Sequence, residues 1–105
     1  MTPSDRLRTP EVGALLDAFV ALDDPEDVYA FLRDVCTIRE VQDIAQRLAV
    51  ARMLASGVHY AEIQEQTGAS STTISRVSRC LNYGEGGYRN VIDRNDEKDG
   101  EEPRP

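Results

Sequence analysis

The sequence is poor in several residue types, and each shortage excludes a class of protein. It has no tryptophan, and aromatic residues make up only 6% of it. Its two cysteines, Cys36 and Cys80, lie far apart without CxxC or Cys/His spacing. We interpret them as reduced, buried thiols, and we expect no structural metal site and no cofactor. No apolar run approaches the roughly 20 residues of a membrane span, and no signal peptide is visible. These absences predict a cytoplasmic protein without membrane contact.

Acids outnumber bases at both ends of the chain but not in its centre. The net charge is −7, with eight acids and three bases in residues 1–34 and six acids and three bases in residues 91–105. Residues 35–90 hold five acids and six bases. Within residues 69–82 the only charged side chains are Arg76 and Arg79. Because the field around the acidic ends repels phosphate, we expect them to suppress non-specific binding to nucleic acid.

The sequence predicts helices with well-marked starts in its first half. Thr9–Glu11 and Asp24–Pro25 each combine an N-cap residue with a proline at the first helical position. Thr37–Glu40 is a capping box that begins the longest helix, Ile38 to about Ser56, which Gly57 ends. The apolar residues of this helix cover more than one stripe. We infer that a second subunit supplies part of its packing surface.

Two further helices follow, and the end of the chain is strongly polar. We expect one helix at about 60–67, ended by Gly68, a second one to about Asn82, and one or two turns at 88–92. Residues 93–105 lack apolar side chains and are predicted to be disordered. The predicted organisation is therefore a flexible leader at 1–9, a helical domain at 10–92 and an acidic, disordered tail at 93–105.

The short helix, the glycine turn and the next helix form a predicted helix-turn-helix. Ile74, Val77 and Leu81 recur at helical spacing and should pack on the core, which leaves polar residues facing outward. Small hydroxyls are poor interior helix formers. They suit a recognition helix that approaches base edges in the major groove, where arginines further along reach phosphates or guanine. We predict that the DNA-binding residues are Ser70, Ser71, Thr72, Thr73, Ser75, Arg76 and Arg79.

Structural interpretations of the same residues stay open. Ser70 or Ser71 can serve simply as an N-cap, and some helix-turn-helix modules bind only protein. The net charge and the scarcity of lysine favour this alternative, a protein-interaction module that keeps the fold without DNA binding. We interpret Tyr60, Tyr83 and Tyr88 as packing residues rather than base-stacking platforms. No nucleophile–base–orienter set is visible, so we do not expect an enzyme.

The stretch AEIQEQTGASSTTISRVSRCL, residues 61–81, resembles the helix-turn-helix of the Trp repressor superfamily. Residues 31–57 and 67–89 are similar to its YerC/YecD-like branch, and the likeness covers about 12–91. It implies an all-α fold of about six helices, an intertwined homodimer and double-stranded DNA as the partner. It also implies a sequence-specific transcriptional regulator, more narrowly a repressor. The family's DNA-contacting positions correspond to Ser71, Thr72, Thr73 and Ser75.

The resemblance also raises the question of a small-molecule effector. In this family two arginines hold the corepressor, and Arg47 and Arg76 occupy the matching positions. The glycine and serine of that pocket are replaced by Val77 and Cys80, so we expect tryptophan not to bind. An unknown carboxylate effector is one interpretation of the two arginines. The interpretation that we favour pairs Arg47 with Asp43 one turn back and places Arg76 on phosphate.

Overall fold

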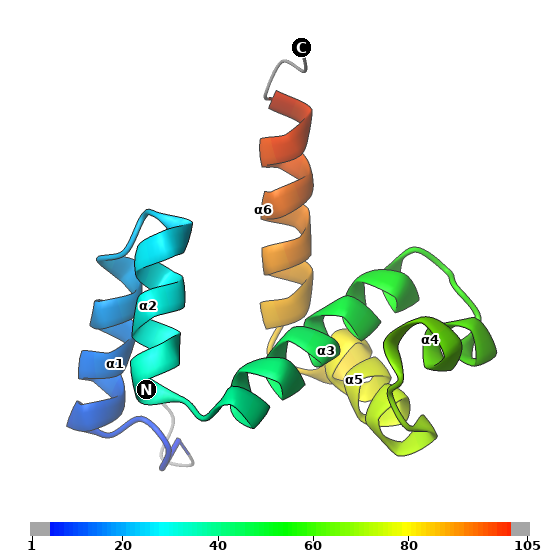
Figure 1. Ribbon diagram of the computed structural model, residues 1–105, viewed down its shortest axis with the longest axis horizontal. Coiled ribbons are helices and arrows are strands. Elements are labelled where there is room, and N and C mark those ends of the chain that lie inside the picture. Colours follow the sequence, from blue (N-terminus) through cyan, green and yellow to red (C-terminus); the bar gives the residue numbers. More distant parts are fainter. Residues whose placement is uncertain (1–4, 102–105) are drawn as a thin grey trace. The chain divides into compact units, whose positions relative to one another are not determined.

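A computed structural model describes residues 5–101, with side chains through residue 97. The described residues form six α-helices and no strand (Figure 1), so the all-α prediction is confirmed. None of these helices is long and apolar enough to cross a membrane. The chain divides into two compact units, residues 1–41 and 42–105. The helices are α1 (Pro10–Val20), α2 (Pro25–Val35), α3 (Ile38–Ala55), α4 (Tyr60–Thr67), α5 (Ser71–Tyr83) and α6 (Gly87–Glu101).

The first unit contains α1 and α2, whose starts lie where their caps predict. The Thr9 hydroxyl accepts a hydrogen bond from the backbone N–H of Val12 at 3.2 Å, and Asp24 caps α2 in the same manner. The rings of Phe19 and Phe31 meet edge to face, 5.3 Å between centroids. No residue of either helix is buried, although both carry an apolar face. The two helices therefore leave much of that face exposed.

The first turn of α3 closes the first unit with the predicted capping box. The backbone N–H of Thr37 donates to the Glu40 carboxylate at 2.8 Å, and the backbone N–H of Glu40 donates to the Thr37 hydroxyl at 3.1 Å. The Thr37 backbone N–H first, and the Thr37 hydroxyl second, hold the pKa of the Glu40 carboxyl below its ordinary value. The reciprocal pair satisfies two backbone donors that would otherwise lack a helical partner.

The second unit holds the hydrophobic core. Four helices and the turn between α4 and α5 contribute to it, and α5 supplies more buried side chains than any other helix. Because one side of α5 is anchored in this way, its opposite side is held outward in a defined orientation. The buried core residues are Val50, Ala51, Ile63, Ala69, Ile74, Val77, Leu81 and Ile92.

The turn between α4 and α5 is fixed by hydrogen bonds as well as by packing. Gly68 has φ 74°, a left-handed conformation that other residues adopt only with strain. The Thr67 hydroxyl donates to the carbonyl of Ile63 at 2.6 Å and accepts from the N–H of Ala69 at 3.1 Å. Gln46 of α3 donates to the Thr67 carbonyl at 3.1 Å. The bond from Gln46 ties the helix-turn-helix to α3.

The last helix is longer than the sequence predicts. The expected turns end at residue 92, yet α6 continues to Glu101, so the described residues 93–101 are helical rather than disordered. Tyr88 and Ile92 pack against the core and hold its first turns. Adding residues to an existing helix is far easier than starting one, and Arg94 supports the next turn by donating to Asn90 at 2.9 Å. The rest of the predicted tail, 102–105, lies outside the described residues, as do 1–4 of the predicted leader.

Candidate nucleic-acid interface

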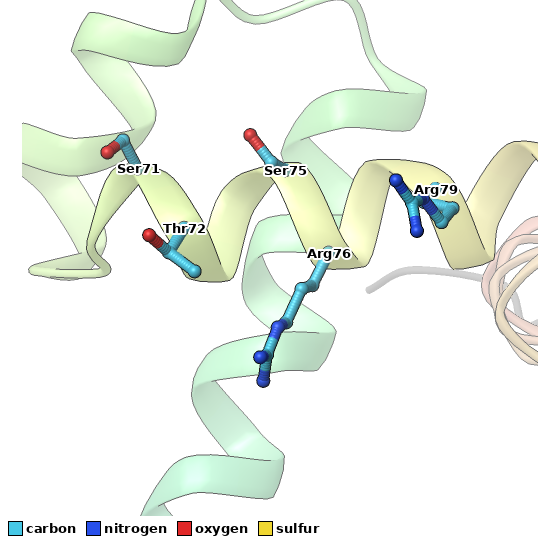
Figure 2. A pocket seen from close by; sticks show the side chains of 5 residues that line it. All are labelled: Ser71, Thr72, Ser75, Arg76 and Arg79. Atoms are coloured by element: carbon cyan, nitrogen blue, oxygen red, sulfur yellow. The ribbon is translucent and has the colours of Figure 1, made fainter.

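The outward side of α5 brings five of the predicted DNA-binding residues together. All five are exposed and line one open hollow of about 340 Å³ on the protein surface (Figure 2). Ile74, Val77 and Leu81 take the opposite side of the helix, which turns about 100° per residue. The residues that line the hollow are Ser71, Thr72, Ser75, Arg76 and Arg79, and we call this set the α5 outer face.

The other two predicted residues, Ser70 and Thr73, do not line the hollow. The Ser70 hydroxyl accepts from the backbone N–H of Thr73 at 3.1 Å and lies 3.1 Å from the Thr73 hydroxyl, to which it donates. Thr73 is half-buried, and Ser70 is the N-cap of α5. The structure therefore gives Ser70 a capping role, the alternative that its sequence context left open.

The α5 outer face combines hydroxyls with positive charge and contains no acid. Hydroxyls both donate and accept hydrogen bonds, whereas guanidinium groups only donate and recognise phosphate or guanine in a planar, two-bonded geometry. The first turn of α5 adds backbone N–H groups, whose dipoles favour an anion. The chemistry of this face suits an anionic, hydrogen-bonding partner such as the edge of a nucleic-acid groove.

Arg47 lies in a different environment from Arg76. Its Nε donates to the backbone carbonyl of Asp43 at 3.2 Å, so the predicted neighbour is correct and the bond is to the main chain. Burial raises the pKa of Tyr88, the positive charge of Arg47 opposes this change, and Cys80 adds to it. Arg47 is not among the residues that line the hollow with Arg76.

Four side chains differ from the sequence predictions, and one of them is Tyr60, which is 45% exposed although the sequence predicts a packing role for it. Tyr83 is 87% exposed and does not pack, whereas Tyr88 is half-buried against the core as predicted. Cys80 is exposed and Cys36 is half-buried, so the prediction of two buried thiols is wrong. Cys80 precedes the buried Leu81 by one residue, which turns it away from the core. The exposure of Tyr83 could have been predicted from the sequence, because Tyr83 follows the outward-facing Arg79 by one helical turn.

Comparison with known proteins finds relatives that the chain covers over most of their length. A protein of Bacillus subtilis (strain 168) described as the uncharacterized protein YerC is 51% identical over 90 residues, which cover 86% of each chain. A candidate Trp repressor from Staphylococcus aureus has a crystal structure that matches with a TM-score of 0.85 and 40% identity, over 91% of this chain and 96% of that one. A TrpR-like protein from Eubacterium eligens ATCC 27750 matches with a TM-score of 0.81 and 48% identity, over 84% and 91% of the two chains.

The family assignment rests on a match that spans nearly all of the described structure. Residues 11–96 fit the family described as Trp repressor protein. They include both helices of the helix-turn-helix and the whole α5 outer face. The similarity of fold to the solved relatives agrees with this match. The chain therefore belongs to the Trp repressor protein family.

Proposed function

We propose that this protein is a sequence-specific, DNA-binding transcriptional regulator, more narrowly a repressor, that acts as a homodimer. The observation that carries the proposal is the α5 outer face, where three hydroxyls and two arginines gather without an acid. The core anchors that face, and the turn at Gly68 orients it. Membership of the Trp repressor protein family supports the same conclusion.

In the proposed complex, α5 enters the major groove by its N-terminal half. Ser71, Thr72 and Ser75 then lie near base edges, where their hydroxyls donate and accept directly or through water. Arg76 and Arg79, further along, contact phosphates or guanine. Two copies present two such helices to successive major-groove half-sites, about 34 Å apart. The operator should therefore be two-fold symmetric.

The homodimer is supported by apolar side chains that one copy leaves in contact with water. Phe19 is 37% exposed, Val35 57% and Ile44 52%, although the sequence places all three on apolar faces of their helices. Large apolar side chains left exposed on helix faces in this way are typical of an interaction site. In a domain of this size, burial against a second copy also compensates for a small core.

Within this proposal DNA binding does not depend on tryptophan. Val77 fills its side of α5 and is only 2% exposed, so no space remains there for an added indole ring. The Nε of Arg47 donates to the backbone carbonyl of Asp43. These contacts favour a packing role for Arg47 and a phosphate contact for Arg76 over a shared carboxylate effector.

The direct test is an in vitro selection. Purified full-length protein is mixed with random duplex DNA at physiological salt, and the retained DNA is sequenced. We expect enrichment of a two-fold symmetric motif. Enrichment of no motif, with the protein folded and dimeric, would contradict the proposal and favour a protein-interaction module.

The arginines of the α5 outer face provide a second test. Arg76→Ala combined with Arg79→Ala should weaken binding to the selected motif by about 100-fold, because two charged contacts are lost at about tenfold each. The dependence of affinity on salt should also fall by roughly 0.9 for each lost phosphate contact. Fluorescence anisotropy across a salt series measures both quantities.

A matched double variant removes the same charge elsewhere. Arg33 and Arg94 are exposed on α2 and α6, outside the α5 outer face. Arg33→Ala combined with Arg94→Ala should leave affinity close to that of the wild-type protein. Equal loss in the two double variants would show that overall charge, rather than this face, drives binding.

A further inference from the structure

Tyr83 is the most exposed aromatic residue of the described structure, and nothing assigned so far uses it. It ends α5, and 87% of its surface is accessible, compared with 51% for Tyr29 on α2. Tyr29 accepts a hydrogen bond from Arg33 at 3.0 Å and stacks beneath its guanidinium group. An aromatic ring held at the end of a well-anchored helix and left open to solvent is placed for an external partner.

The position of Tyr83 around the helix axis identifies the surface that it shares. At about 100° per residue, it lies in angle between Thr72 and Arg76, both members of the α5 outer face. It follows Arg79 by one turn, so the two side chains lie on the same side of α5. Tyr83 therefore continues the α5 outer face toward the C-terminal end of the helix.

A second positively charged group lies at this end of α5. Arg89 of α6 donates through Nη2 to the Asn82 side-chain carbonyl at 3.1 Å, and Asn82 in turn donates to the carbonyl of Ser78 at 3.0 Å. These bonds hold a guanidinium group beside the residue that precedes Tyr83. The end of α5 thus carries a phenol and a positive charge together, a combination that suits phosphate.

We propose that Tyr83 contacts the sugar–phosphate backbone of bound DNA, its phenol O–H donating to a phosphate oxygen and its ring packing on deoxyribose. This inference rests on the proposed function and deepens it. Tyr83 lies about 12 Å along the axis from Ser75, because each residue advances a helix by about 1.5 Å. Base contacts belong to the N-terminal part of a recognition helix, so the other end meets the backbone, where tyrosine hydroxyls are established donors.

The experiment compares two substitutions of this residue with a matched control. Tyr83→Phe removes only the hydroxyl, Tyr83→Ala removes the ring as well, and Tyr29→Phe makes the first change on α2. Affinity for the selected motif and for a mismatched duplex is measured over a salt series, with circular dichroism and sedimentation to check fold and dimer. Because one hydrogen bond is lost, we expect Tyr83→Phe to bind about five- to tenfold more weakly to both duplexes. Tyr83→Ala should bind more weakly still.

The salt series distinguishes this contact from that of an arginine. Phenol carries no charge at neutral pH, so Tyr83→Phe should keep the wild-type salt slope, whereas Arg79→Ala should lower it. Wild-type affinity in Tyr83→Phe, with wild-type DNA binding intact, would overturn this inference alone. The inference would also be overturned if Tyr83→Ala weakened the protein dimer rather than the protein–DNA complex. Absence of any DNA binding by the wild-type protein would overturn the proposed function as well.

Discussion

At the scale of single residues, neighbouring hydroxyls of the same segment have different roles. Ser70 is occupied within the protein, because it caps α5 and bonds to Thr73. Ser71, the next residue, is exposed in the hollow. The sequence presents Ser70 and Ser71 as equivalent hydroxyls. Because α5 begins between them, Ser70 is its N-cap and Ser71 lies on its outward face.

The capping role of Ser70 makes a prediction about stability. Ser70→Ala removes the acceptor for the backbone N–H of Thr73 and should lower the free energy of unfolding by about 1 kcal/mol. Ser70→Asn keeps a good capping side chain and should lower it by much less. Urea denaturation followed by circular dichroism gives both values. Equal stability of Ser70→Ala and the wild-type protein would show that the cap contributes nothing.

At the scale of secondary-structure elements, the start of α3 depends on a carboxylate. Glu40 accepts from the backbone N–H of Thr37, and this bond requires the ionised form to be strong. The pKa of Glu40 is lowered by that bond first and by the Thr37 hydroxyl second. Because the folded-state pKa lies below the unfolded one, the stabilising contribution is complete above the ordinary glutamate pKa. It is lost as the pH falls through the lowered value.

This linkage is measurable at one side chain. An NMR titration of the Glu40 carboxyl should give a pKa below that of an ordinary glutamate. In Thr37→Ala the pKa should rise toward the ordinary value but stay below it, because the backbone N–H at position 37 remains. A Glu40 pKa that does not change between the two proteins would rule out a contribution from the Thr37 hydroxyl.

At the scale of the whole molecule, burial is uneven between the two units. Every buried hydrophobic residue among those described lies in the second unit, between Val50 and Ile92. The first unit has apolar helices without a buried residue. A chain that folds cooperatively needs to cover such faces, since apolar burial supplies most of the folding free energy. A second copy of the chain is the partner that we propose for this surface.

The proposed dimer is tested at Ile44, which is 52% exposed on α3. Ile44 belongs to the second unit, so Ile44→Asp tests an exposed apolar position of α3, and it should convert a wild-type dimer largely to monomer in analytical ultracentrifugation. Gln42→Asp introduces the same side chain on the same helix, about 200° away around its axis, and should leave the dimer intact. A wild-type protein that stays monomeric at all concentrations would contradict the dimer.

The sequence by itself determined the parts of this protein that depend on local interactions. The starts of α1, α2 and α3 follow from Thr9, Asp24 and the Thr37–Glu40 capping box, because a cap acts within three residues of itself. The turn at Gly68 follows from the need for a positive φ. The periodic spacing of apolar residues was enough to predict the buried side of α5 and, by exclusion, most of its outward face.

Only the tertiary structure decided the features that depend on contacts between elements. Packing of Tyr88 and Ile92 starts α6, which then continues into a segment whose composition predicts disorder. The position of α5 on the core leaves Tyr83 exposed beside the α5 outer face, although a tyrosine in sequence is equally compatible with packing. It also separates Arg47 from the hollow that holds Arg76. Burial is a property of the distant residues that cover a side chain, and no local pattern specifies those residues.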